Sequence, residues 1–233
     1  QIIALSATIK NADEIAGWLK AGLVCSEYRP VKLRKGVFYP EENKCIIDFL
    51  DSAEELEKTS ADGEVALCKN TLEKNKQALV FVSTRRSAEA TAEKISLPVD
   101  RLLKNKEEKE NLKHLAGEAE NALSAPTKQC RRLARLLARG VAFHHAGLVA
   151  KQRKIIEDGF KSGMVKFIVA TPTLAFGINL PAYRVVIRDA KRFDGNYGSH
   201  YISNFEIQQM MGRAGRPKYD KEGEAIIMAK NSR

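Results

Sequence analysis

Two arginines near the end of the chain combine a residue type and a spacing that could act on phosphate. Arg213 and Arg216 each directly follow a glycine, and the small glycines would let another surface approach. A guanidinium stays charged at any working pH and presents a planar fork that matches phosphate oxygens. On one continuous helix, Gln209, Arg213 and Arg216 would stand at i, i+4 and i+7 and share a face. The pattern predicts a helical face that binds a triphosphate; its plainer interpretation is a basic helix end exposed to water.

The elements around these arginines carry their own signals. The run from Ser203 to Glu206 fits a capping box, in which both side chains satisfy the first backbone amides of a helix, so a helix should start there. Upstream, the apolar run 167–170 predicts a buried strand that ends in the polar residues Thr171 and Thr173. In open parallel sheets the carboxyl ends of the strands deliver groups to a ligand. We therefore expect these hydroxyls to face a ligand.

Strand-like apolar runs alternate with helix-like periodic segments along the whole chain. Extended segments are expected at 1–5, 31–39, 44–49, 77–82, 141–143, 167–170, 184–187 and 225–228. Helices are expected at 12–19, 64–75, 87–95, 130–139 and 150–162, and a Lys- and Glu-rich helical face exposed to water between 104 and 124. This alternation predicts an α/β fold with a mostly parallel sheet.

Five segments, taken in order, resemble the characteristic motifs of one enzyme family. They are Leu5-Ser6-Ala7-Thr8, Val80 to Arg86, Phe143 to Leu148, Val169 to Ala182 and Gln209 to Arg216, which look like motifs III, IV, IVa, V and VI. The chain is similar to superfamily 2 helicases of the Ski-like branch. Within that branch it resembles the archaeal DNA-repair helicases known as Hjm and the helicase domain of polymerase theta. The resemblance spans nearly the whole chain.

The resemblance implies a RecA-like architecture and a division of the chain into two parts. Residues 1–30 correspond to the end of the family's first RecA-like domain. Residues 31–233 correspond to its second, a three-layer domain with a mostly parallel sheet flanked by helices. The sequence contains neither the G-x-x-x-x-G-K-[ST] loop that cradles phosphates nor the DExH box that holds magnesium. We therefore expect a piece of a larger enzyme, whose ATP and Mg²⁺ are bound mainly by the first domain.

The resemblance also implies roles for individual residues. Arg213 and Arg216 correspond to arginine fingers, which neutralise charge on the transferred phosphoryl group and can be worth ~10³–10⁵ in rate. Gln209, Gly177 and Asn179 would lie beside the γ-phosphate. The residues expected to hold the backbone of a single strand, without reading its bases, are Ser83, Thr84, Arg85, His145, Thr171 and Thr173. Ser6 and Thr8 would couple the two domains.

The segment 188–202 lies between the last two motifs and contains a turn signal, Asp194-Gly195, flanked by aromatic and basic residues. In the similar DNA helicases a β-hairpin at this place separates the strands. We therefore expect Phe193 and Tyr197 to meet the terminal base pair of a duplex. The alternative is a connecting loop with ordinary surface aromatics.

His144 and His145 stand together, and two imidazoles invite a metal or acid–base interpretation. Adjacent residues of a strand point to opposite faces, however, and no third ligand stands at metal spacing. The four cysteines, at 25, 45, 68 and 130, form no C-x-x-C pair and are expected to be reduced. No metal site is expected.

The charge balance favours a polyanionic partner. Lysine and arginine number 39 against 29 aspartates and glutamates, a formal net charge of +10, and phosphate neutralisation dominates nucleic-acid affinity. No apolar run approaches the ~18–20 residues of a membrane span, so no membrane partner is expected. We expect single-stranded and forked DNA and the first RecA-like domain as partners, and a monomeric fragment. Its location would be cytoplasmic if the source is archaeal and nuclear if it is eukaryotic.

The choice between DNA and RNA rests on three residues of the motifs. Pro172, Leu174 and Pro217 look like the DNA-handling members of the family rather than the RNA-handling ones. The prediction is part of an ATP-dependent DNA helicase that translocates on single-stranded DNA and unwinds forked duplexes in repair or fork restart. The alternatives are a Ski-like RNA helicase and a non-catalytic nucleic-acid-binding module.

Overall fold

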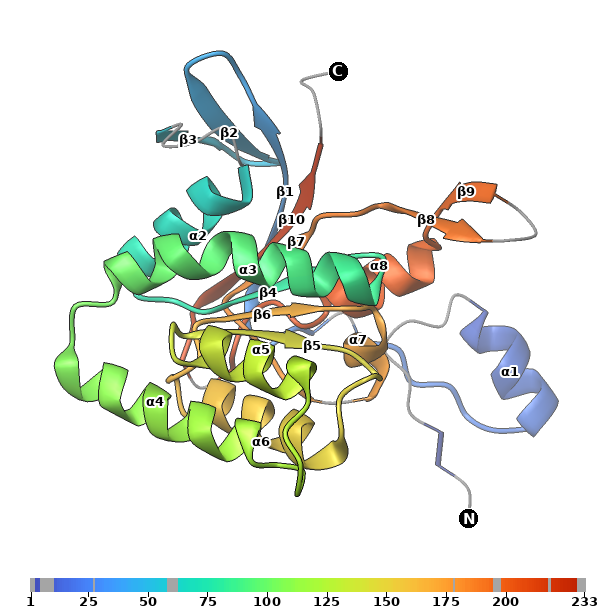
Figure 1. Cartoon of the computed structure of the whole chain (residues 1–233). Helices are drawn as coiled ribbons and strands as arrows, with labels where there is room; N and C mark the ends of the chain where they lie inside the picture. The colour runs from blue at the N-terminus through green and yellow to red at the C-terminus, as the bar shows by residue number, and fades with distance from the viewer. Residues whose placement is uncertain are drawn as a thin grey trace.

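The structure of the chain is a computed structural model that describes residues 3–4, 11–26, 28–57, 63–177, 179–194, 198–217 and 219–229. Its helices are α1 (Ala12–Leu19), α2 (Gly63–Glu73), α3 (Arg85–Leu102), α4 (Lys106–Glu120), α5 (Lys128–Leu137), α6 (Ala150–Lys161), α7 (Thr173–Gly177) and α8 (Asn204–Met211). Its strands are β1 (Lys32–Pro40), β2 (Lys44–Phe49), β3 (Ala53–Glu57), β4 (Ala78–Phe81), β5 (Val141–His144), β6 (Phe167–Ala170), β7 (Arg184–Ile187), β8 (Lys191–Asp194), β9 (Gly198–Tyr201) and β10 (Glu222–Met228) (Figure 1).

One eight-stranded sheet forms the centre of the molecule, in the order β3-β2-β1-β10-β7-β4-β6-β5. The strands from β1 to β5 in that order run parallel, whereas β2 and β3 add an antiparallel edge. Every residue of β4, β5, β6 and β7 is buried, as in a parallel sheet whose two faces are both covered by helices. The predicted α/β fold with a mostly parallel sheet is confirmed, and it is that of a RecA-like domain.

Two elements differ from the sequence pattern for identifiable reasons. The pattern misses β3, because Leu56 is the one buried residue of that strand and its pairing with β2 makes it extended. α3 is longer than the predicted helix 87–95, since it continues through Pro98 to Leu102. A proline inside a helix costs about 3 kcal/mol. Ile95 and Val99, one turn apart and both fully buried, keep α3 packed on the core through the proline.

A pair of buried charges joins two strands at the edge where the parallel strands begin. Arg184 on β7 and Glu224 on β10 stand opposite each other in the register, are fully buried and form an ion pair of 2.5 Å. Burial by itself would raise the pKa of Glu224, but the charge of Arg184, the Tyr183 hydroxyl and Lys74 lower it. Removing one partner of such a pair costs ~3–5 kcal/mol. Leaving either charge alone in the interior would therefore destabilise the neighbourhood of β7 and β10.

The segment before β1 stands apart from the sheet. α1 lies to one side of the molecule in Figure 1 and buries none of its residues. Trp18 is 82% exposed, and Val24 beyond the helix is 93% exposed. The chain rejoins the domain at Arg29, whose Nη2 donates a hydrogen bond to the Ala214 carbonyl at 2.8 Å. Across the described residues, no helix combines the length and the apolar character needed to cross a bilayer.

Candidate functional site

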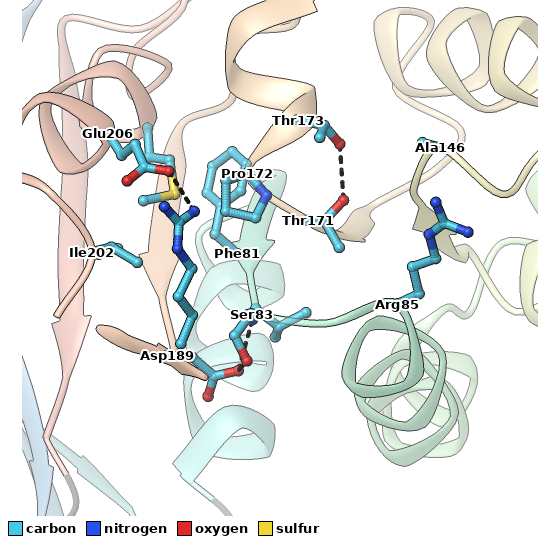
Figure 2. A pocket seen from close by; sticks show the side chains of 13 residues that line it. Phe81, Ser83, Arg85, Ala146, Thr171, Pro172, Thr173, Asp189, Ile202 and Glu206 are labelled. Atoms are coloured by element: carbon cyan, nitrogen blue, oxygen red, sulfur yellow. Dashed lines mark hydrogen bonds and ion pairs between the residues drawn. The ribbon is translucent and has the colours of Figure 1, made fainter. Parts of the chain in front are cut away.

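An open hollow of about 320 Å³ lies at the edge of the sheet where the parallel strands end (Figure 2). Its walls come from the residues that follow β4, β6 and β7, and from α8. Four residues that the sequence singled out, Ser83, Arg85, Thr171 and Thr173, line it together. They come from segments far apart in the chain, which the parallel strand order brings to one edge.

One side of the hollow is lined by hydroxyls and a cation. The hydroxyl oxygens of Thr171 and Thr173 are 2.9 Å apart, with Thr171 buried and Thr173 exposed. Arg85 is the exposed first residue of α3 and lies near Ala146 in Figure 2. Thr84 caps the same helix, since its hydroxyl oxygen accepts the backbone amide of Ser87 at 3.0 Å. This side can offer hydrogen bonds and positive charge to an anion.

The opposite side of the hollow carries two carboxylates, Asp189 and Glu206, together with the cation Arg192. Asp189 accepts hydrogen bonds from the backbone amide of Ser83 at 2.9 Å and from its hydroxyl at 3.2 Å. Glu206 lies on the same side, away from Arg85 (Figure 2). Arg192 is already paired with Glu206 at 2.9 Å, so an anion in the hollow would lie against Arg85 and the threonines. Neither acid was predicted from the sequence to line a ligand site, although Glu206 was expected in the capping box. Asp189 stands two residues after β7, just as Ser83 stands two after β4, and this shared position is the signal that could have found it.

The two histidines point in different directions. Nε2 of His144 lies 3.2 Å from Glu157 of α6, whereas Nε2 of His145 lies 3.2 Å from Glu89 of α3. Burial lowers the pKa of both histidines, partly offset by the glutamates. His145 is 1% exposed and accepts the Gly147 amide, so it holds the loop after β5 rather than facing solvent. In the described ranges no cluster of His, Cys, Asp and Glu is suited to a metal ion.

The predicted helical face of Gln209, Arg213 and Arg216 is wrong, because α8 ends at Met211. The helix does begin at the predicted capping box, but Gly212 terminates it, and both arginines lie in the turns that follow. Only Gln209 belongs to the helix. A capping box predicts where a helix begins, and nothing in the spacing of the arginines shows where it ends.

Arg213 is turned toward the polar segment that follows β6. Its Nε and Nη2 donate to the Ala175 carbonyl, and its Nη1 lies 3.4 Å from Oδ1 of Asn179. Burial lowers the pKa of Arg213. Its partners are therefore a carbonyl and an amide, and among the described residues no carboxylate pairs with it. A half-buried guanidinium without a counter-ion is suited to an incoming anion.

Arg216 is in the opposite situation. Its Nε donates to Asp220 at 2.8 Å, its Nη2 to the same carboxylate at 3.1 Å, and its Nη1 to Gln77 at 2.7 Å. Lys76 also donates to Asp220, at 2.7 Å. Burial would raise the pKa of Asp220, but the hydrogen bonds from Arg216 and Lys76 lower it. The charge of Arg216 is therefore already balanced inside the domain.

The surface that approaches Gly215 belongs to the chain itself. Gly215 has φ +90, and a Cβ there would lie 2.6 Å from Val31. Gly223 of β10 is equally close, since a Cβ on it would lie 2.4 Å from the Gly215 nitrogen. A side chain at either position would push the turn that carries Arg216 off the sheet. The glycine that the sequence linked to a ligand surface is needed for internal packing.

The segment between the last two motifs forms the predicted hairpin. β8 and β9 pair antiparallel, with Phe193 opposite Ser199, and project away from the sheet (Figure 1). Phe193 is 78% exposed and Tyr201 70% exposed. Tyr197, like the coupling residues Ser6 and Thr8, lies outside the described residues. The hairpin therefore presents aromatic side chains to solvent.

The parallel sheet, the hollow at its carboxyl edge and the arginine turn after α8 define the class of protein as a RecA-like helicase domain. A family model described as the helicase conserved C-terminal domain matches residues 122–218.

Similar proteins are archaeal helicases. The ATP-dependent DNA helicase Hel308 of Methanocella arvoryzae is 47% identical over 231 residues, which cover 99% of this chain and 30% of the relative. That of Pyrococcus horikoshii is 48% identical over 98% of this chain and 30% of the relative. The Hel308 helicase of Pyrobaculum calidifontis is 43% identical over 99% of this chain and 32% of the relative. The chain spans about a third of the length of these curated relatives. It belongs to the superfamily 2 Ski-like helicases of the archaeal Hel308 or Hjm type, as their second RecA-like domain.

Proposed function

We propose that the chain is the part of an ATP-dependent DNA helicase that supplies an arginine finger to the nucleotide site and holds single-stranded DNA. Arg213 carries the proposal. Its guanidinium is half-buried, bonded to a carbonyl and an amide, and paired with no carboxylate of the described residues. In a two-domain motor such a group can neutralise charge that develops on the transferred phosphoryl group.

The proposal places the nucleotide between two domains. Residues 31–233 would be the second RecA-like domain, and residues 1–30 the end of the first, which would bind most of the ATP and the Mg²⁺. The exposure of α1 and of Trp18 supports this division, because a neighbouring domain would cover those apolar side chains. Ser6 and Thr8 would couple the two domains.

Residues near Arg213 would complete the second domain's share of the nucleotide site. Asn179, which Arg213 already approaches, and Gly177 at the end of α7 would lie beside the γ-phosphate, with Gln209 on the last turn of α8. Arg216 would support this turn, because moving it to a phosphate would leave the buried Asp220 with Lys76 alone. The proposal therefore separates the roles of the two arginines.

The DNA backbone would follow the basic side of the hollow. Arg85 and Thr173 are exposed there, and Thr171 lies between them. Ser83, bonded to Asp189, and Thr84, which caps α3, would hold the loop after β4 in place beside the DNA backbone, and His145 would position the loop beside it. None of these groups needs to read a base, which suits a motor that must move along any sequence.

The test uses the full-length parent protein. We expect ATP hydrolysis that single-stranded DNA stimulates, and unwinding of forked DNA faster than of the matching RNA duplex. Preferential unwinding of RNA would favour the Ski-like RNA helicase instead. Absence of both activities would leave a nucleic-acid-binding module. The relatives are named as DNA helicases, which supports the first outcome.

A further inference from the structure

The hairpin runs into α8 through Ile202 and Ser203, and one ion pair adds a side-chain contact between the two elements. Nη1 of Arg192, on β8, lies 2.9 Å from Oε1 of Glu206, in the first turn of α8. The other oxygen of Glu206 accepts the backbone amide of Ser203 at 3.2 Å and its hydroxyl at 3.0 Å. The Glu206 carboxylate therefore caps the helix with one oxygen and binds Arg192 of the hairpin with the other.

Arg192 makes a second contact at the base of the hairpin, in addition to its ion pair with Glu206. Nε of Arg192 lies 3.4 Å from the ring of His200, its partner across the two strands. The Ile202 amide donates to the Ala190 carbonyl at 3.0 Å, and the Ile202 side chain is buried. Burial would raise the pKa of Glu206, but the bonds from Ser203 and the charge of Arg192 lower it, so this carboxylate stays ionised.

The other end of α8 carries the nucleotide-site arginine. The helix has eight residues, so it is about 12 Å long, and Arg213 follows it after one glycine. Met210 and Met211 are buried, which keeps the helix packed as one body. One short packed helix therefore connects Glu206 at its start with Arg213 just beyond its end.

We propose that the Arg192–Glu206 ion pair is the joint through which the nucleotide-driven movement of Arg213 reaches the strand-separating hairpin. The inference rests on the proposed function and adds to it two positioning residues. Both line the side of the hollow opposite Arg85 and pair with each other, so neither charge is left for a phosphate.

The ion pair can be removed by substitutions that leave the fold and the helix cap in place. Arg192 is 44% exposed, and ion pairs of this kind contribute little to folding free energy, so its loss should leave the protein folded. Glu206→Gln removes the charge but keeps a side chain that can complete the capping box. Ser203→Ala is the matched control, because it weakens the start of the helix and leaves the ion pair in place.

The experiment measures base pairs unwound per ATP hydrolysed by the full-length parent. We expect Arg192→Gln and Glu206→Gln to lower unwinding of forked DNA several-fold. ATP hydrolysis stimulated by single-stranded DNA, single-strand binding and melting temperature should stay near the parent values. The double variant should be no worse than either single one, Arg192→Lys should restore much of the unwinding, and Ser203→Ala should leave the ratio unchanged.

Two results would contradict the proposed role of the Arg192–Glu206 ion pair. Unwinding and hydrolysis could fall in parallel, which would make the pair a structural contact, or neither could change, which would leave it without a role. Failure of the proposed function looks different, because the unmodified parent would then show no unwinding of forked DNA at all.

Discussion

At the scale of single residues, Arg213 and Arg216 look alike in sequence and differ in electrostatics. Arg216 is bonded to a buried carboxylate, and its charge is compensated within the domain. Arg213 is bonded to a carbonyl and an amide, and burial alone lowers its pKa. The same residue type therefore supports two roles, one toward a ligand and one toward the fold.

Substituting each arginine by alanine in the full-length parent should separate these roles. Arg213→Ala should lose ATP hydrolysis by orders of magnitude with little change in melting temperature or single-strand binding, because its interaction is made mainly in the transition state. Arg216→Ala should lower the unfolding free energy by about 3 kcal/mol, the low end for a broken buried pair, since Lys76 still reaches Asp220. Stability and turnover are measured on the same preparations. An unchanged melting temperature in Arg216→Ala would contradict the structural role and make Arg216 a candidate arginine finger again.

At the scale of elements, the hairpin and α8 form one unit. β8 and β9 hold Phe193 out into solvent, and α8 links their base to Arg213. An aromatic ring at a duplex junction can replace the stacking of an opened base pair, worth ~1–3 kcal/mol per base. The exposed position of Phe193 fits that task.

Replacing Phe193 and Tyr197 by alanine in the full-length parent tests this element. We expect unwinding of forked DNA to fall several-fold. ATP hydrolysis stimulated by single-stranded DNA should continue near its normal rate, because the aromatic side chains of the hairpin would not touch the nucleotide. Tyr219→Ala offers a control, since Tyr219 is 76% exposed but lies outside the hairpin. A parallel loss of both activities would make the hairpin a translocation element.

At the scale of the whole molecule, buried titratable groups link stability to pH. Burial lowers the pKa of His144 and His145, so below the ordinary value of about 6.5 the unfolded chain takes up protons first and unfolding is favoured. The pKa of Glu224 and that of Asp220 are also lowered, so their contribution is complete above about pH 4 and is lost as the pH falls through their folded values. Both groups therefore lower the unfolding free energy as the pH falls.

The unfolding free energy of the chain should therefore be constant near pH 8 and fall in two stages toward acid. Urea unfolding followed at a series of pH values measures it. His145→Gln should remove part of the first stage, between about pH 7 and 5, and leave the second. A flat profile down to about pH 5 would show that the histidines titrate alike in the folded and unfolded chain.

Local patterns in the chain were enough to predict the α/β fold and most of its strands and helices. Periodicity, capping and turn signals act over a few residues, so 167–170 and Ser203 could be read as a strand and a helix start. Thr171 and Thr173 were predicted to face a ligand because they follow a strand of a parallel sheet, and the family resemblance implied the same of Ser83 and Arg85; these four residues line one hollow.

Tertiary structure alone decided which partners those residues have. Ser83 and Asp189 are 106 positions apart, and Arg213 and Ala175 are 38 apart. Such pairs depend on the strand order and on where α8 ends, neither of which leaves a local pattern in the chain. The charge balance of each arginine, the carboxylates in the wall of the hollow and the Arg192–Glu206 ion pair all follow from that packing, because an electrostatic partner is set by distance in space.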